Sequence, residues 1–250
     1  MPDQFARADA FRALHVPGRP LVLYNVWDVG SARAVAASGA PALATGSWSV
    51  AAAQGYPDGE RMPLDLALSI LGRICAAVDL PVSADLEAGY DDVARTVARA
   101  IEAGAIGCNL EDSLPATGAM RPVAEAAARL AAVRAAADAG GVRAFVNART
   151  DVFFQAPATA HDEAIADEAI ERARAYADAG ADGVFVPGLA DERLIARITA
   201  ASPLPVNIQG GPGLPPPARQ AELGVARVSW GHRSYLAVMQ AVEDAARAAL

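Results

Sequence analysis

The stretch EAGAIGCNLED, residues 102–112, joins the end of a helix-like segment to a buried strand through one glycine turn. Gly104 suits this turn because glycine ends helices in backbone conformations that other residues avoid. The apolar run that follows finishes at Glu111 and its acidic neighbour. The same order of alanine-rich segment, glycine turn and apolar run returns around ADAGGV (137–142) and DAGADG (178–183). The sequence therefore predicts repeated helix–turn–strand units.

Eight strand-like runs occur along the chain, separated by alanine-rich segments with helical periodicity. Eight strands alternating with helices at this length favour an α/β fold, a (β/α)8 TIM barrel, with residues 1–250 as a single domain. A doubly wound open sheet is the alternative, although no GxGxxG motif follows the first strand. We expect an extra N-terminal helix, residues 3–14, to cover the bottom of the barrel. The predicted strands are residues 21–26, 42–47, 81–87, 106–112, 143–151, 182–188, 205–209 and 226–230, and the clearest helical segments are 63–79, 91–103, 122–139 and 161–179.

The composition narrows the class of protein. The chain is 53% hydrophobic, yet no apolar run is long enough to cross a membrane, and no signal peptide is recognisable at the N-terminus. A net charge of −8 argues against nucleic acid or an anionic membrane as a partner. Cys75 and Cys108 fall in apolar segments and are expected to be reduced structural thiols, which fits a cytoplasmic protein.

Lysine is absent from the chain, so all 21 basic residues are arginine. This excludes Schiff-base chemistry and a phosphate-binding loop built around a lysine. Any side-chain cation that holds an anionic substrate must therefore be an arginine.

Acidic residues gather where the predicted strands end, which is where barrels carry their chemistry. Asp85 and Glu87 stand two residues apart, so on an extended strand they would point the same way. Glu111 ends the next strand, and Asp58 lies in the loop after the second. Four carboxylates at one half-buried mouth require a cation, and ligands made only of oxygen favour Mg²⁺ or Mn²⁺. The alternative is that the acids cap helices or pair with arginines.

The fifth predicted strand ends in NARTD, and its Arg149 could bind a carboxylate through two parallel N–H groups. The alternative for Arg149 is a salt bridge to Glu111 or Asp151. Strand seven contributes Asn207, a further candidate for substrate binding.

Seven stretches together resemble the isocitrate lyase and phosphoenolpyruvate mutase superfamily. They are NVWDVGSARAVAASG (25–39), TGSWSVAAAQGYPDG (45–59), SADLEAGY (83–90), GCNLED (107–112), NARTDVF (147–153), DGVFVPG (182–188) and ELGVARVSWG (222–231). The resemblance implies the same barrel, a bound Mg²⁺, and a small α-oxo or α-hydroxy carboxylate, or a phosphonate analogue, as substrate. It also implies that a C–C or P–C bond is broken or formed through an enolate-like intermediate.

The resemblance assigns roles to the matched positions. Asp85 is similar to the direct metal ligand, and Asp58, Glu87 and Glu111 to the acids that hold the metal through its water shell. Arg149 resembles the arginine that neutralises the oxyanion, and with Asp58 and Glu111 it completes the expected catalytic set. The segment whose backbone N–H groups grip the substrate carboxylate is similar to Gly46, Ser47 and Trp48.

The chain also departs from that superfamily. Isocitrate and methylisocitrate lyases carry a Lys-(Lys/Arg)-Cys-Gly-His signature in the mobile loop after strand four, whereas residues 111–126 here contain no Cys, His or Lys. A site without this acid favours decarboxylation or hydrolysis of a C–C bond in an oxaloacetate-like substrate. The alternatives are an enzyme acting on a P–C bond, of the phosphoenolpyruvate mutase or phosphonopyruvate hydrolase type, and a barrel that binds metal and carboxylate without turnover.

Two further expectations concern the periphery. Superfamily members are commonly tetramers built from dimers that exchange a C-terminal helix, and we expect a homo-oligomer here, a dimer or a tetramer; whether the last helix is exchanged stays open. His232 is expected to start that helix or to lie at an interface, and His15 is expected to be solvated.

Overall fold

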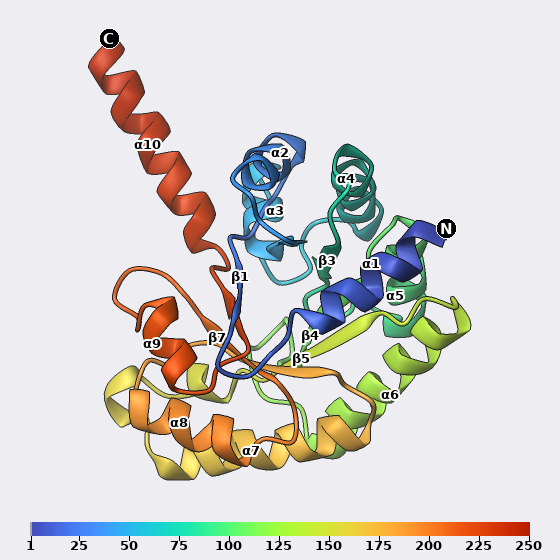
Figure 1. The fold of residues 1–250 in the computed structure, drawn as a ribbon, viewed down its shortest axis with the longest axis vertical. Helices are drawn as coiled ribbons and strands as arrows, with labels where there is room; N and C mark the ends of the chain where they lie inside the picture. The colour runs from blue at the N-terminus through green and yellow to red at the C-terminus, as the bar shows by residue number, and fades with distance from the viewer. Residues whose placement is uncertain (1) are drawn as a thin grey trace.

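The eight predicted strands form one parallel sheet that is almost closed into a barrel, as the computed structural model of residues 2–250 shows (Figure 1). Neighbours along the sheet follow the order β1-β8-β7-β6-β5-β4-β3-β2. The α/β barrel predicted from the sequence is therefore confirmed. The strands are β1 (Leu21–Leu23), β2 (Leu43–Ala44), β3 (Val82–Asp85), β4 (Gly107–Glu111), β5 (Phe145–Arg149), β6 (Gly183–Val186), β7 (Val206–Gln209) and β8 (Arg227–Ser229).

A narrow seam closes the barrel between β1 and β2. Among residues 2–250 the two strands share no ladder. A parallel bridge between Val26 and Thr45 joins them, and the Asn25 side chain donates a further hydrogen bond to the Thr45 backbone oxygen at 2.9 Å. Two backbone hydrogen bonds make the bridge: the Val26 N–H donates to Ala44 at 2.9 Å, and the Gly46 N–H donates to Val26 at 3.2 Å. The seam lies beside the carboxyl ends of both strands, so it borders the region where barrel enzymes place their sites.

Helices follow the strands and surround the barrel. Their buried positions are often alanine, as at Ala166, Ala169 and Ala173 of one helix, which lets helix and strand backbones approach closely. Asp28 caps the second helix as part of a capping box with Ser31. The helices are α1 (Pro2–Ala13), α2 (Val29–Ala37), α3 (Ser47–Ala53), α4 (Leu64–Ala77), α5 (Val93–Glu102), α6 (Val123–Ala139), η1 (Val152–Phe154), η2 (Ala158–Ala160), α7 (Glu163–Asp178), α8 (Glu192–Ala201), α9 (Pro217–Glu222) and α10 (Arg233–Ala249).

Helix α1 covers the bottom of the barrel, as predicted. Its Phe11 packs edge-on against Phe145 with 5.7 Å between ring centroids, and its Arg12 forms an ion pair with Asp182. His15 follows the helix and stacks on Phe145 at 3.9 Å, with only 8% of the residue exposed. The expectation of a solvated His15 was wrong, because the barrel bottom offers an aromatic surface that covers the imidazole.

Helix α10 extends away from the barrel in Figure 1 instead of packing along its wall. Ser234 is its one buried residue, and Leu236 and Val242 are 47% and 57% exposed. An apolar groove of about 660 Å³ is lined by Tyr24 and Trp27 together with Val238 of this helix. In residues 2–250, no helix combines the length and the apolar character that a membrane span requires.

Candidate active site

A cavity of about 230 Å³ opens at the carboxyl ends of the strands. Residues from most strands reach it, so side chains far apart in sequence meet at one place. This is the face where barrels of this class place their chemistry. The residues that line it include Asn25, Ser47, Asp85, Asn109, Arg149 and Ser229.

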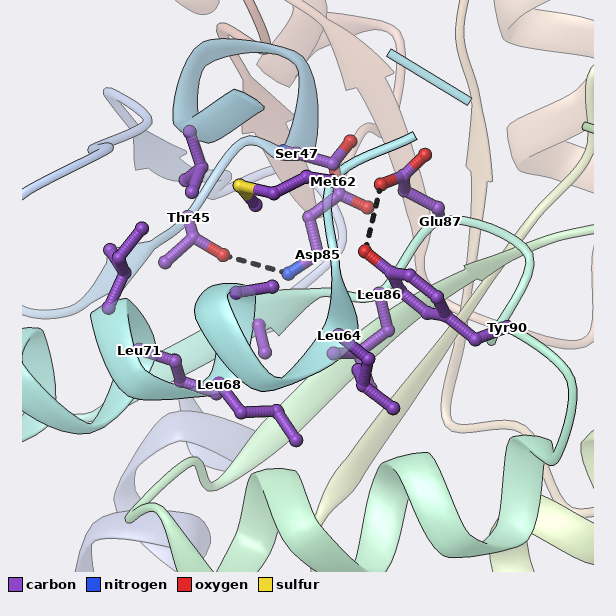
Figure 2. A pocket seen from close by; sticks show the side chains of 14 residues that line it. Thr45, Ser47, Met62, Leu64, Leu68, Leu71, Asp85, Leu86, Glu87 and Tyr90 are labelled. Carbon is purple, nitrogen blue, oxygen red and sulfur yellow. Dashed lines mark hydrogen bonds between the residues drawn. The ribbon is translucent and has the colours of Figure 1, made fainter. Parts of the chain in front are cut away.

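Asp85, the last residue of β3, is held by the start of helix α3. Ser47 donates its backbone N–H and its hydroxyl to Oδ2 of Asp85, at 3.0 and 2.9 Å. The backbone N–H of Asp85 donates to the Thr45 hydroxyl at 2.9 Å, which fixes the strand end (Figure 2). Oδ1 accepts no hydrogen bond from the described residues, so one carboxylate oxygen is available to a ligand.

Glu87 does not follow Asp85 into the cavity. Strand β3 ends at Asp85, and Glu87 has a φ of +54°, so the alternation of an extended chain no longer applies. Its carboxylate accepts the backbone N–H of Glu60. It also accepts the hydroxyl of Tyr90 (Figure 2). Behind it lies a small cavity with apolar walls, which include Leu64.

The loop that carries Asp58 is tied to Glu87 by a strained cluster. Glu60, Glu87 and Tyr90 are the three non-glycine residues with positive φ in the described chain, at +60°, +54° and +57°. They contact one another, since the Tyr90 N–H also donates to the Glu60 carboxylate at 2.6 Å. Left-handed backbone at such residues costs about 1–2 kcal/mol each, and it concentrates at functional sites.

The carboxylates destabilise one another's charge. Burial, together with the charges of Asp58 and Asp85 and against the hydrogen bond from Glu60, raises the pKa of Glu87 to about 7. Partial burial, and then the charge of Asp85, raise the pKa of Asp58, which lies at the exposed rim. Without a cation, this end of the barrel holds more negative charge than its arginine balances.

Arg149 lies at the end of β5 between two acids. Its Nε and Nη2 donate to the two oxygens of Asp151 at 2.6 and 3.0 Å, and Nη1 lies 2.8 Å from Glu111. Burial alone would lower the pKa of Arg149, but the charges of Glu111 and Asp151 raise it above its usual value. A guanidinium has five N–H donors, so two remain for a ligand in the cavity. Both salt bridges considered for Arg149 therefore exist, and they orient it.

Glu111 is partly buried beside Arg149. Burial raises its pKa against the opposing charge of Arg149. The Ser113 hydroxyl lies 3.1 Å from Glu111 and 3.0 Å from Asp151, and its single hydrogen can serve only one of them at a time. Ser113 belongs to the loop of residues 112–124, where it bridges to Met120 in a short antiparallel turn.

A metal ion would be held loosely by protein atoms here. In residues 2–250, no three His, Cys, Asp or Glu side chains are placed to hold one ion together. Mg²⁺ commonly keeps several waters and uses one or two carboxylates, so this arrangement suits it. The free Oδ1 of Asp85 and the excess of acids over cations fit a hydrated hard ion.

Of the other residues predicted to bind substrate, some have free hydrogen-bond donors and others have already used theirs. The Gly46 N–H is used by the seam and the Ser47 N–H by Asp85, which leaves the N–H of Trp48 unpaired among the described residues. Asn207 is 1% exposed and donates to the Ser229 hydroxyl at 3.0 Å, so it lies behind the cavity wall.

Two cavity residues had little support from the sequence. His232 begins α10 as expected, but it also lines the cavity, with its ring 5.4 Å from that of Trp48. Burial and the charges of Arg233 and Arg149 lower its pKa. Phe154 covers Arg149 with its ring centroid 5.8 Å from the guanidinium carbon. For His232, its position shortly after the last strand was a signal in the sequence that it could reach the cavity. For Phe154 no such signal was present in the sequence.

The chain is similar to known proteins over almost its whole length. The profile of the family described as phosphoenolpyruvate phosphomutase matches residues 11–250. An uncharacterised protein of Mycobacterium tuberculosis is 39% identical over 240 residues, which cover 96% of this chain and 88% of that protein. An oxaloacetate decarboxylase of Ectopseudomonas mendocina is 32% identical over 246 residues, covering 95% and 82%. The crystal structure of a candidate phosphonomutase from Burkholderia cenocepacia J2315 superposes with a TM-score of 0.96 at 55% identity, over 99% and 100% of the two chains.

Proposed function

This chain belongs to the phosphoenolpyruvate phosphomutase family, and from that premise we propose that it is a Mg²⁺-dependent lyase that breaks a C–C bond in a short α-oxo dicarboxylate such as oxaloacetate. The family includes lyases, and its barrel is the one seen here. The relatives named oxaloacetate decarboxylase support this substrate class over others.

One observation carries the proposal. Asp85, with its Oδ1 free, and Arg149, with N–H donors unused, line the same cavity. A 2-oxo carboxylate presents oxygens that a cation and hydrogen-bond donors can share. Loss of CO₂ from the adjacent carbon transfers negative charge to that same oxo group, so groups placed there beforehand stabilise the transition state.

The chain's own residues then have distinct tasks. Arg149 donates to the substrate oxygen that becomes the enolate oxyanion, and Asp151 and Glu111 keep its guanidinium oriented. For oxaloacetate, the bond between C3 and C4 breaks, its electron pair forms the enolate across C2 and C3, and C4 leaves as CO₂. A proton added at C3 gives pyruvate.

The metal site that we propose consists of four acids. Asp85 would hold Mg²⁺ directly, and Mn²⁺ in its place, while Asp58, Glu87 and Glu111 would act through the water shell; the bound ion would withdraw electrons from the substrate's oxo group. The raised pKa values of Asp58, Glu87 and Glu111 support a cation at this position.

The loop of residues 112–124 favours decarboxylation within this class. Ser113 is buried between acids, and Thr117 is exposed, so the loop brings no strong acid to the cavity. Water can protonate an enolate without a dedicated acid. A C–C hydrolase, which needs only a placed water, remains within the same proposal.

A P–C bond enzyme is the second candidate, and the 55% identical candidate phosphonomutase favours it. A phosphonate carries more negative charge than a carboxylate and requires more cationic donors. Arg149 is the one arginine among the residues that line the cavity in the described chain, which favours the carboxylate.

The deciding experiment mixes the purified chain and Mg²⁺ with oxaloacetate or phosphonopyruvate. We expect CO₂ and pyruvate from oxaloacetate, above the rate with Mg²⁺ alone, and no phosphate from phosphonopyruvate. Phosphate release would favour the second candidate. If both compounds bind and neither gives a product, the proposed enzyme function is wrong, and the protein is a barrel that binds metal and carboxylate without turnover.

Assembly and location are part of the same proposal. We propose a homo-oligomer, a dimer or a tetramer, because α10 leaves Leu236 and Val242 exposed and the neighbouring groove is apolar. Cys75 and Cys108 are free thiols, which supports a cytoplasmic location.

A further inference from the structure

Arg227 is a fully buried arginine in the interior of the barrel. It belongs to β8, is 0% exposed, and forms no ion pair with a carboxylate in residues 2–250. Burial lowers its pKa to about 9, with the charge of Asp85 acting in the opposite direction, so it remains protonated at neutral pH. An unpaired buried cation is expensive for a fold, since an apolar side chain of similar volume would avoid the cost.

The guanidinium contacts two residues that line the substrate cavity. Its Nε donates to the Ser229 hydroxyl oxygen at 3.1 Å, and its Nη2 donates to Oδ1 of Asn109 at 3.3 Å. Each of these acceptor atoms receives a second donor. Asn147 donates to Oδ1 of Asn109 at 2.9 Å, and Asn207 donates to the Ser229 oxygen at 3.0 Å.

Asn109 and Ser229 form what we call the cavity floor. Their contacts with Arg227 determine which hydrogen-bonding groups this floor can present to a ligand. A guanidinium has donors and no acceptor, so the oxygen of the Asn109 amide must face Arg227 and its NH₂ group is left over. The Ser229 oxygen accepts two N–H groups, so its hydroxyl hydrogen is left over in the same way. Both cavity residues are thereby restricted to donating.

The remaining members of the network are incompletely satisfied. Nη1 of Arg227, Oδ1 of Asn147 and Oδ1 of Asn207 are buried and have no partner in the described part of the chain. Buried polar atoms without hydrogen-bond partners lower the stability of the fold. They are expected mainly at functional sites, where the polar groups are kept for binding or catalysis.

We propose that Arg227 is a positioning residue, which by occupying the acceptor atoms of Asn109 and Ser229 makes the cavity floor a donor-only subsite for one carboxylate of the ligand. Naming the ligand as an oxo acid rests on the proposed function; the donor floor itself does not. Asp85 and Asp58 also line the cavity, and Asp85 is the neighbour of Asn109 across β3 and β4, so the donors of the floor lie beside acids of opposite polarity.

The test measures oxalate binding by calorimetry at a fixed Mg²⁺ concentration, with no turnover required. Arg227→Met is expected to raise the Kd of oxalate about tenfold, and Ser229→Ala by a similar factor, the scale of one hydrogen bond to a charged group. Because both changes act on the same floor, the double variant is expected to fall clearly short of the product of the two effects. Arg134→Met, which removes an arginine paired with Asp182, is the matched control and should leave the Kd unchanged.

Urea unfolding separates positioning from a structural role. Arg227→Met should be at least as stable as the parent chain, because it removes an unpaired buried charge. Lower stability with an unchanged Kd would identify a structural arginine and overturn the inference. If Arg227→Met does not fold, Arg227→Lys replaces it; an ammonium keeps the charge but cannot reach both acceptors with the planar fork, so the Kd should still rise.

The outcomes also distinguish this inference from the proposed function. Weaker oxalate binding by Arg227→Met, in a chain that turns over no oxo acid, would leave the inference standing and remove the function. Oxaloacetate turnover with unchanged KM and unchanged oxalate Kd in Arg227→Met would overturn the inference alone. A parent chain that does not bind oxalate at all would overturn the donor floor.

Discussion

Ser47 gives both of its donors, the backbone N–H and the hydroxyl, to the same oxygen of Asp85, at 3.0 and 2.9 Å. The carboxylate is thereby fixed in rotation, and its second oxygen stays free on a residue that lines the cavity together with Arg149. A group with one oxygen held and one free is prepared to bind a cation in a single orientation.

Removal of the Asp85 carboxylate should therefore remove the metal site. At a hundredfold excess of Mg²⁺ over its Kd, the parent chain should gain about 2.7 kcal/mol in free energy of unfolding. Asp85→Ala should gain nothing, whereas the exposed Asp65→Ala should behave as the parent. Equal Mg²⁺ affinity of the parent and Asp85→Ala in a calorimetric titration would place the site elsewhere.

Arg149→Lys should weaken oxalate binding by about 1.5–3 kcal/mol, because lysine keeps the charge and loses the planar fork. The remaining N–H donors of Arg149 depend on its attachment to Asp151, which a lysine cannot reproduce. Arg197→Lys changes an exposed pair with Asp167 and serves as the control. An unchanged oxalate Kd would remove Arg149 from the site.

Isocitrate and methylisocitrate should not be cleaved at a measurable rate. Residues 112–124 contain no Cys, His or Lys, and Ser113 is held between Glu111 and Asp151. The assay follows release of glyoxylate or pyruvate with Mg²⁺ present. Cleavage at a rate near that on oxaloacetate would show that the missing acid is not required.

His15 should make stability depend on pH below 6.5. Burial first, and then the charge of Arg227, lower its pKa from 6.5 to about 3. Between these values the unfolded chain binds a proton that the folded chain does not, so the free energy of unfolding falls as pH falls, by up to about 1.4 kcal/mol per unit.

The measurement compares urea unfolding of the parent and His15→Phe at several pH values between 7 and 5, where the carboxylates that titrate are the same in both proteins. Phenylalanine can keep the stacking on Phe145 and cannot be protonated. The difference in free energy of unfolding between the two proteins should therefore change in favour of the variant as pH falls. A constant difference would show that the His15 pKa is not lowered.

Light scattering should detect an oligomer at micromolar concentration. Helix α10 exposes Leu236 and Val242, and residues 241–250 are all exposed, so these surfaces are available to a second copy. A chain that ends at Arg233 should lose the assembled form. A monodisperse monomer of the full chain would contradict the proposed assembly.

Periodicity predicted the barrel because each strand has its own apolar run and most of the helix-to-strand turns contain a glycine. The cluster of acids was also visible, since the strand ends of a barrel meet at one face. Glu87 shows the limit of this reasoning. Its spacing from Asp85 predicts a shared direction only while the strand continues, and a left-handed backbone after Asp85 turns it toward Tyr90.

Arg227 could not be assigned from the pattern. Alternation in the eighth strand indicates which residues share a side, but an arginine in a strand usually reaches solvent. Its burial depends on Asn109 and Ser229, which are 118 and 2 residues away in sequence. The contact with Ser229 is local, but the contact with Asn109 follows from closure of the barrel, and no local signal in the sequence records it.

The seam between β1 and β2 has a consequence for exchange of amide hydrogens with deuterated solvent. The N–H groups of Val26 and Gly46 make the two backbone bonds that close the seam, so one local opening frees both. They should exchange together, and earlier than the amides of β4 and β5, which share a continuous ladder. Asn25 and Ser47 are the chain neighbours of Val26 and Gly46, and both line the cavity. A ligand that contacts both would therefore hold the seam closed and slow amide exchange at Val26 and Gly46 without contacting those two residues.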